Sequence, residues 1–279
     1  KKVGADCGLD RVHAEMPVVA FDEIHKYSRW KQFLKGFFDD YEENCRIIAT
    51  GSARMDVYKR GGDSMMGRYF PYHVHPLSVA ELLTTELPGE EIIRPPSKLD
   101  DEEWTALCDF GGFPEPFLKR SRMFSSRWNR LRREQLLKSD IRDLTRISEI
   151  DQLGALAEIL ANRSGEQLVY KALGNEVKID EKTAKSWTVA LKHLFYGFEI
   201  RPWYKNVENS IRKTPKWFLR DWALVVEPGK RFETMVACHL LKAVEGWTDL
   251  GLGEFELFYI RDKQKREVDF MVTRDREPW

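Results

Sequence analysis

The chain has 279 residues, of which 42% are apolar, enough to build the cores of two or three small domains. Lys plus Arg and Asp plus Glu both number 45, so the net charge of zero indicates no particular class of partner, although charges can still gather locally. No apolar run approaches the roughly 18 to 20 residues that span a bilayer, and no signal peptide is visible. Four widely spaced cysteines without a C-x-x-C pair argue against a disulfide framework or a structural zinc site. We therefore expect a cytoplasmic protein without a membrane partner.

The first predicted elements form a β–α–β unit. Residues 17–21 are uniformly apolar, which is typical of a strand buried on both faces of a parallel sheet. Apolar side chains at helical spacing follow over 30–37, and a second apolar run over 46–50 ends in Gly51 and Ser52. Strand, helix and parallel strand predict an open α/β sheet. Residues 68–77 could supply one more strand.

Helical patterns dominate the rest of the chain, after a proline-rich connector over 88–98. We predict helices over residues 100–109, 121–146, 150–162, 168–173, 182–195 and 232–244. We predict strands over residues 201–206, 216–219, 255–261 and 267–273. Within 164–222, two helices followed by two strands are the layout of a winged helix.

The helix over 121–146 is strongly basic. Its cationic side chains are Arg127, Arg130, Arg132, Arg133, Lys138, Arg142 and Arg146. The charges wrap around the helix, which favours a solvated face with some ion pairs over a binding surface.

Candidate catalytic residues follow the two apolar strands. Asp22 and Glu23 end the first strand, where a P-loop ATPase has a carboxylate that holds Mg²⁺ and a Glu that polarises the attacking water. Thr50 and Ser52 end the second strand, where a hydroxyl can sense the γ-phosphate. Simpler alternatives stay open, namely a solvated strand end for the acids and turn capping for Ser52.

Arg68 follows a loop over 59–66. At the end of such a loop it could reach the nucleotide of a neighbouring subunit as an arginine finger, whose fixed charge stabilises the transition state. On spacing alone, an ordinary surface arginine is the simpler interpretation.

Motifs along nearly the whole chain agree in order with one family. They are Asp22-Glu-Ile-His-Lys26, Ala49-Thr-Gly-Ser52, Gly67-Arg68, His75-Pro-Leu-Ser-Val-Ala-Glu-Leu82, Phe110-Gly-Gly-Phe-Pro114 and Thr214-Pro-Lys-Trp-Phe-Leu-Arg-Asp-Trp222. Together they resemble the archaeal and bacterial AAA-type ATPases of the AAA+ superfamily. The resemblance implies ATP and Mg²⁺ as cofactors, with Asp22 binding both, and homo-oligomers in which a finger acts between subunits.

The resemblance also implies a domain order, because those proteins join an ATPase core to a winged helix and a nuclease-like region. We expect a partial ATPase core over 1–88, a helical lid or connector over 89–163, a winged helix over 164–226 and a truncated PD-(D/E)XK-like region over 227–279. The expected fold is therefore an α/β P-loop-type sheet fragment, a helical region with a winged helix, and an α+β nuclease-like C-terminal piece.

The family's phosphate-binding loop, G-x-x-x-x-G-K-[ST], has no counterpart in the sequence. Without its Lys and its cradle of backbone N–H groups, ATP affinity should be very poor, so we expect this chain by itself to be inactive. Either the loop lies upstream of Lys1, as we expect, or the chain is a degenerate copy.

Glu233 on a helix and Asp269 on a strand match the Mg²⁺-binding acids of the nuclease-like fold. The third element of that fold, [Asp/Glu]-x-Lys, would come after Trp279. The site is therefore expected to be incomplete, and an ion pair with a nearby arginine is the structural alternative for both acids.

DNA is the remaining candidate partner. Lys185 and Lys192 on the second helix of the winged helix, with Arg212 and Lys213 in its wing, could contact DNA. Winged helices also serve as protein–protein modules. The leading interpretation is therefore an ATPase associated with DNA, and the alternative is a nucleic-acid- or protein-binding winged-helix module with a degenerate, inactive ATPase half.

Overall fold

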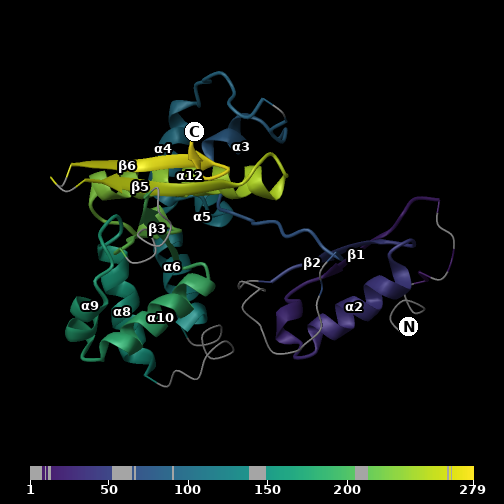
Figure 1. The fold of residues 1–279 in the computed structure, drawn as a ribbon, viewed down its shortest axis with the longest axis horizontal. Helices are drawn as coiled ribbons and strands as arrows, with labels where there is room; N and C mark the ends of the chain where they lie inside the picture. Colours follow the sequence, from purple (N-terminus) through teal and green to yellow (C-terminus); the bar gives the residue numbers. More distant parts are fainter. Residues whose placement is uncertain are drawn as a thin grey trace. The chain divides into compact units, whose positions relative to one another are not determined.

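The structure is a computed structural model. It describes residues 8–9, 11, 14–51, 65, 67–89, 91–137, 149–204, 213–262, 264 and 266–279. The chain divides into two compact units, residues 1–71 with 193–195, and residues 72–192 with 196–279. The architecture is mixed α/β, with a small parallel sheet near the N-terminus, a helical middle and a mixed five-stranded sheet near the C-terminus (Figure 1). The predicted division into four domains stays a prediction.

The first unit contains the predicted β–α–β arrangement. Strands β1 (Val18–Phe21) and β2 (Arg46–Ala49) pair in parallel and are joined by the short 3-10 helix η1 (Ile24–Lys26) and helix α2 (Trp30–Tyr41). The ring of Phe21 packs edge-on against Phe37 of α2, with centroids 5.0 Å apart. This aromatic contact attaches one face of the sheet to the helix.

The other face of this small sheet is open within the unit. Val18 is 58% exposed and Ile48 is 51% exposed, because alternate strand residues point away from α2. The expectation of strands buried on both faces is therefore not met inside this unit. Residues 67–77, all of them described, form no strand, so the additional strand predicted there is wrong.

The first helices of the second unit are short, and its last helix, α12, is long. Its helices are α3 (Val79–Leu83), α4 (Asp101–Phe110), α5 (Pro114–Lys119), α6 (Arg122–Gln135), α8 (Ile150–Asn162), α9 (Tyr170–Val177), α10 (Glu181–His193) and α12 (Pro228–Asp249). Side-chain caps fix the starts of α4 and α12, where Asp100 accepts from the N–H of Glu102 and Glu227 accepts from that of Gly229. None of the helices in the described part of the chain is both long and apolar enough to cross a membrane.

Helix α9 runs through Gly174 to Val177, further than the predicted helix over 168–173. A Cβ at Gly174 would lie 2.7 Å from the carbonyl oxygen of Ile179. The glycine therefore serves close packing against the next turn and does not end the helix.

The five strands of the second sheet run in the order β4-β3-β5-β6-β7. They are β3 (Gly197–Pro202), β4 (Lys216–Leu219), β5 (Phe255–Arg261), β6 (Glu267–Arg274) and β7 (Glu277–Pro278). Strand β3 pairs antiparallel with β4 and parallel with β5, while β5, β6 and β7 pair antiparallel in succession. The hairpin predicted as a wing therefore belongs to the same sheet as the C-terminal strands.

Strand β3 starts earlier than the predicted 201–206. Gly197 allows the shift, because a Cβ there would lie 2.3 Å from Cζ2 of Trp217 on the paired strand. The glycine lets the indole lie flat across the backbone, and Phe198 and Ile200 then enter the core.

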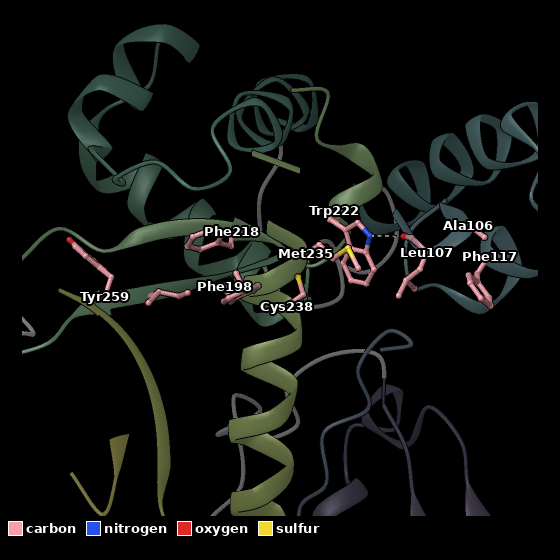
Figure 2. Close-up of a cluster of buried hydrophobic side chains, with 11 residues drawn as sticks. Ala106, Leu107, Phe117, Phe198, Phe218, Trp222, Met235, Cys238 and Tyr259 are labelled. Atoms are coloured by element: carbon pink, nitrogen blue, oxygen red, sulfur yellow. Dashed lines mark hydrogen bonds between the residues drawn. The ribbon is translucent and has the colours of Figure 1, made fainter. Parts of the chain in front are cut away.

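The core of the second unit lies between helix α12, strands β3 and β4, and helices α4 and α5 (Figure 2). Its buried members are Ala106, Leu107, Phe117, Phe198, Ile200, Phe218, Trp222, Met235, Ala237, Cys238 and Tyr259. In Figure 2 the indole Nε1 of Trp222 donates a 2.8 Å hydrogen bond to the carbonyl oxygen of Leu107. The large ring is thereby buried without an unpaired donor.

The Phe110–Pro114 motif is explained by this packing. Gly111 ends α4 with φ +79°, in the left-handed region that favours glycine. A Cβ at Gly112 would lie 2.5 Å from the carbonyl oxygen of Leu77 and 2.6 Å from Cη2 of Trp222. The two glycines therefore let the backbone pass between segments that are distant in sequence.

Residues 73–79 are attached along one face of α12. His73 Nδ1 lies 2.9 Å from Oδ2 of Asp249, and His75 Nε2 lies 2.7 Å from Oε2 of Glu245. Lys242 Nζ donates to the carbonyl oxygen of Pro76 at 2.8 Å. The partners on α12 recur every three or four residues, so they share a face. Asp249 and Lys242 thereby take up the backbone N–H of His73 and the carbonyl oxygen of Pro76, two groups that a strand over 68–77 could otherwise have paired.

Candidate functional site

The carboxyl ends of β1 and β2 bring Asp22 and Thr50 together. The two strands are parallel, so their last residues emerge at the same edge of the sheet, where α/β proteins bind ligands. Backbone hydrogen bonds fix the junction, with Thr50 N–H donating to Phe21 at 2.9 Å and Ile24 N–H donating to Thr50 at 3.1 Å. Thr50 Oγ1 donates to Asp22 Oδ1 at 2.5 Å.

Thr50 therefore orients the Asp22 carboxylate. The same hydroxyl oxygen accepts a 3.3 Å hydrogen bond from the backbone N–H of Glu23. The sequence left open whether Thr50 or Ser52 serves this edge. Ser52 lies outside the described residues, and Thr50 is the hydroxyl that the structure places beside Asp22.

Glu23 has an unusual backbone conformation, with φ 52° and ψ 34°. This left-handed conformation costs a non-glycine residue on the order of 1 kcal/mol, and such strain clusters at functional sites. The carboxylate of Glu23 lies 3.1 Å from Nζ of Lys26 and 3.8 Å from Nε2 of His25. A second acid is thus held one residue after Asp22, at the same edge of the sheet.

The candidate metal ligands Asp22, Glu23 and Thr50 all offer oxygen atoms, which fits Mg²⁺. That ion takes one or two protein carboxylates and completes its shell with water and substrate phosphates. Among the described residues, no group of three or more His, Cys, Asp or Glu side chains is arranged to hold a metal ion by itself. An ion at Asp22 would accordingly depend on the bound nucleotide for further ligands.

Arg68 pairs with Asp39 of helix α2 within the first unit. Its Nε lies 2.8 Å from Oδ1 of Asp39, and about a third of its side chain is exposed. An arginine finger would have to leave this ion pair. The finger role of Arg68 stays a prediction.

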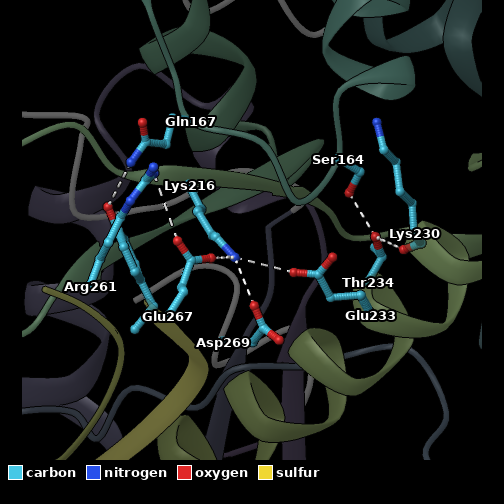
Figure 3. A network of polar contacts seen from close by, with 10 residues as sticks. Ser164, Gln167, Lys216, Lys230, Glu233, Thr234, Arg261, Glu267 and Asp269 are labelled. Atoms are coloured by element: carbon cyan, nitrogen blue, oxygen red, sulfur yellow. Dashed lines mark hydrogen bonds and ion pairs between the residues drawn. The ribbon is translucent and has the colours of Figure 1, made fainter. Parts of the chain in front are cut away.

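A second cluster of charges lies in the C-terminal sheet, around Lys216 at the start of β4 (Figure 3). The ammonium of Lys216 lies 2.5 Å from Oε1 of Glu267, 3.0 Å from Oδ1 of Asp269 and 3.4 Å from Oε1 of Glu233. The lysine side chain is only 7% exposed. One cation therefore faces three carboxylates in a mostly buried place.

Burial and the neighbouring charges shift the pKa values in this cluster. Burial opposes the charge of Lys216, but its hydrogen bonds to Glu267 and Asp269 raise the pKa above the usual value. Burial raises the pKa of Glu233, and the negative charge of Asp269 adds to the rise while Lys216 opposes it. Lys216 is therefore the cation that offsets the mutual repulsion of the three carboxylates.

In the structure the ammonium of Lys216 contacts the carboxylates of both Glu233 and Asp269. Their metal-binding role stays a prediction. The structure shows the alternative, an ion-paired cluster, with a lysine in place of the expected arginine. Sequence reasoning missed Lys216, although a lone lysine opening the apolar run 216–219 was a signal for a buried ion pair.

The predicted DNA contacts are spread over the second unit. Lys185 is exposed on α10, and Lys213 is exposed before β4. Lys192 is 2.9 Å from Oε2 of Glu199 and is therefore neutralised. Arg212 lies outside the described residues. DNA binding by these residues stays a prediction.

Comparisons with known proteins bear on the first unit most directly. Residues 6–83 match the family model described as an AAA domain. Residues 101–228 match a second model, described as a domain of unknown function (DUF8612). The AAA match contains β1, α2 and β2, so the edge with Asp22, Glu23 and Thr50 lies inside an AAA-type region. This likeness indicates an ATPase-related protein.

Three curated proteins are similar to this chain over most of its length. An uncharacterized protein of Mycobacterium tuberculosis and one of Mycobacterium bovis are each 23% identical over 270 residues, which is 94% of this chain and 57% of the relative. An uncharacterized protein of Methanocaldococcus jannaschii is 23% identical over 227 residues, covering 74% of this chain and 46% of that protein. The chain thus spans about half the length of the curated relatives it matches. No solved structure matches it significantly.

Proposed function

We propose that this chain carries the metal- and water-binding side of an ATP-hydrolysing AAA-type site. The observation that carries the proposal is the 2.5 Å hydrogen bond from Thr50 Oγ1 to Asp22 Oδ1 at the shared edge of two parallel strands. The surrounding residues 6–83 match an AAA domain. Strand ends of this kind present acids to a nucleotide from a rigid backbone.

Each residue has a distinct role in the proposal. Asp22 holds the ion through its charge, and Thr50 fixes which way the carboxylate points. Glu23 accepts a proton from the attacking water, since its carboxylate directly follows Asp22 at the same edge of the sheet. Mg²⁺, when bound with ATP, neutralises the charge that develops on the β- and γ-phosphates.

The phosphates themselves would be held by a loop that this chain does not contain, because its sequence has no G-x-x-x-x-G-K-[ST] motif. The proposal therefore concerns the whole protein. It includes homo-oligomerisation in which Arg68 leaves Asp39 and reaches the nucleotide of a neighbouring copy.

An Asp22→Asn substitution in the whole protein tests the ion-binding role. Asparagine keeps the shape and an oxygen that can accept from Thr50, but it removes the charge that holds the ion. We expect Mg²⁺-dependent ATP turnover to fall by about 100-fold or more, since the ion supplies several kcal/mol of charge stabilisation. Turnover within twofold of the parent protein would refute the assignment of Asp22.

A further inference from the structure

Helix α6 forms one wall of a concave groove in the second unit, with a cavity volume of about 720 Å³. Residues of α8 line the opposite side. The polar side chains that matter in the groove are those of Arg127, Asn129, Arg130, Arg133, Glu158 and Asn162. The strongly basic helix thus lines this groove. The groove shares no residue with the proposed ATPase site.

Of the four α6 arginines that line the groove, one is engaged with other side chains and three are not. Arg132 packs over the ring of Phe113, 3.8 Å from its centroid, and lies 3.3 Å from Oδ2 of the buried Asp221. Arg127, Arg130 and Arg133 are exposed and form no ion pair with any residue in the described part of the chain. Glu158 is the sole acid among the described residues that line the groove.

The spacing of the three exposed arginines places their side chains along the wall of the groove that α6 forms. Positions 127, 130 and 133 are three residues apart, so successive side chains are about 4.5 Å apart along the helix axis and about 60° apart around it. Their guanidinium groups therefore cover a row of about 9 Å. A row of unpaired guanidinium groups is suited to a ligand with regularly repeated negative charges, because each group can hold a phosphate with two parallel hydrogen bonds.

We propose that this groove binds the backbone of single-stranded nucleic acid. A single strand presents one phosphate per nucleotide and can enter a concave surface, whereas a duplex is a stiff, convex cylinder that would touch only the rim. The amides of Asn129 and Asn162 offer further hydrogen bonds to sugar or base. An acidic peptide is less suited, because its carboxylates point to alternate sides of the chain and are not evenly spaced.

The test uses the 279-residue chain and a fluorescein-labelled 20-nucleotide oligothymidylate, with binding followed by fluorescence anisotropy at several salt concentrations. The variant Arg127→Ser/Arg130→Ser/Arg133→Ser removes the three unpaired charges at exposed positions. We expect its Kd at 100 mM salt to rise about tenfold or more. The slope of log K against log[salt] should become shallower by about 2, since each phosphate contact on a single strand contributes about 0.7.

The matched control Lys98→Ser/Lys171→Ser/Lys182→Ser removes three exposed charges that lie outside the groove and outside the predicted DNA contacts. Its Kd should change less than twofold, and both variants should keep the circular dichroism spectrum of the parent chain. The proposal is overturned if the parent chain does not bind, if the lysine variant loses as much affinity as the arginine variant, or if duplex DNA binds more tightly. It is also overturned if a polyglutamate peptide binds as tightly as the oligonucleotide. None of these outcomes depends on the ATPase proposal.

Discussion

The ammonium of Lys216 lies 2.5 Å from Oε1 of Glu267, and the same nitrogen also contacts Asp269 and Glu233. The four side chains come from β4, β6 and α12, so one lysine joins three elements of the second unit. Breaking a buried ion pair from one side is strongly destabilising, because the remaining charges lose their partner.

We therefore expect Lys216→Met to lower the free energy of unfolding by about 1 to 3 kcal/mol at pH 7, less than for a fully buried pair because the Asp269 side chain is 58% exposed to solvent. The loss should shrink toward pH 4, because protonation removes the repulsion among the three carboxylates. Urea unfolding at several pH values measures both effects. Lys213→Met, at a nearby exposed position, should change stability by less than about 0.5 kcal/mol. Equal effects of the two substitutions would show that the cluster does not hold the elements together.

His239 should make the stability of the second unit depend on pH. Its Nδ1 lies 2.8 Å from the carbonyl oxygen of Met235 and carries the proton, and its Nε2 accepts from the N–H of Val79 at 3.1 Å. Burial lowers the pKa of His239 below the usual value. Protonation would also place an N–H on Nε2 against the N–H of Val79.

The unfolded chain takes up a proton near pH 6.5, whereas the lowered pKa of folded His239 delays its protonation to lower pH, so stability falls as the pH drops below about 6.5. We expect His239→Gln to make this dependence shallower between pH 7 and 5.5, by at most about 1.4 kcal/mol per pH unit for one proton. Glutamine keeps an acceptor for Val79 and cannot titrate. Urea unfolding across this pH range measures the slope, and an unchanged slope would contradict the neutral assignment.

Gly112 should tolerate no side chain. Its missing Cβ would lie 2.5 Å from the carbonyl oxygen of Leu77, a backbone atom that cannot move aside as a flexible side chain could. Gly112→Ala should therefore destabilise the chain by about 2 kcal/mol or more through overpacking. Gly246→Ala is the matched control, since this helical glycine has no atom within 4 Å of its ideal Cβ. That substitution should stabilise α12 by up to about 1 kcal/mol, and thermal melting compares the two.

Local patterns sufficed to predict much of the fold. The β–α–β unit follows from two apolar runs around an amphipathic helix, and strand β5 has the predicted bounds 255–261. Asp22 and Thr50 were predicted to end two successive strands of a β–α–β unit, and the structure places them together at one edge of the parallel sheet. These features depend on residues close in sequence or on a rule of sheet geometry.

Long-range packing decided what the sequence did not reveal. Lys216 meets Glu267 and Asp269, which lie about fifty residues later and whose register depends on the whole sheet. The strand predicted over 68–77 is absent because polar groups of that segment bond to α12. The early start of β3 depends on the contact of Gly197 with Trp217. No local periodicity contains this information.

The measurement that tests the central claim most directly is ATP turnover and ATP binding by the Glu23→Gln variant of the whole protein. Glutamine keeps the shape of Glu23 but cannot accept a proton from water. Since a positioned general base contributes about 10² to 10⁴ in rate, we predict that turnover falls by at least about 100-fold while the Kd for ATP changes less than about twofold. Unchanged turnover in a variant that still binds ATP would contradict the assignment of Glu23 and with it the proposed site.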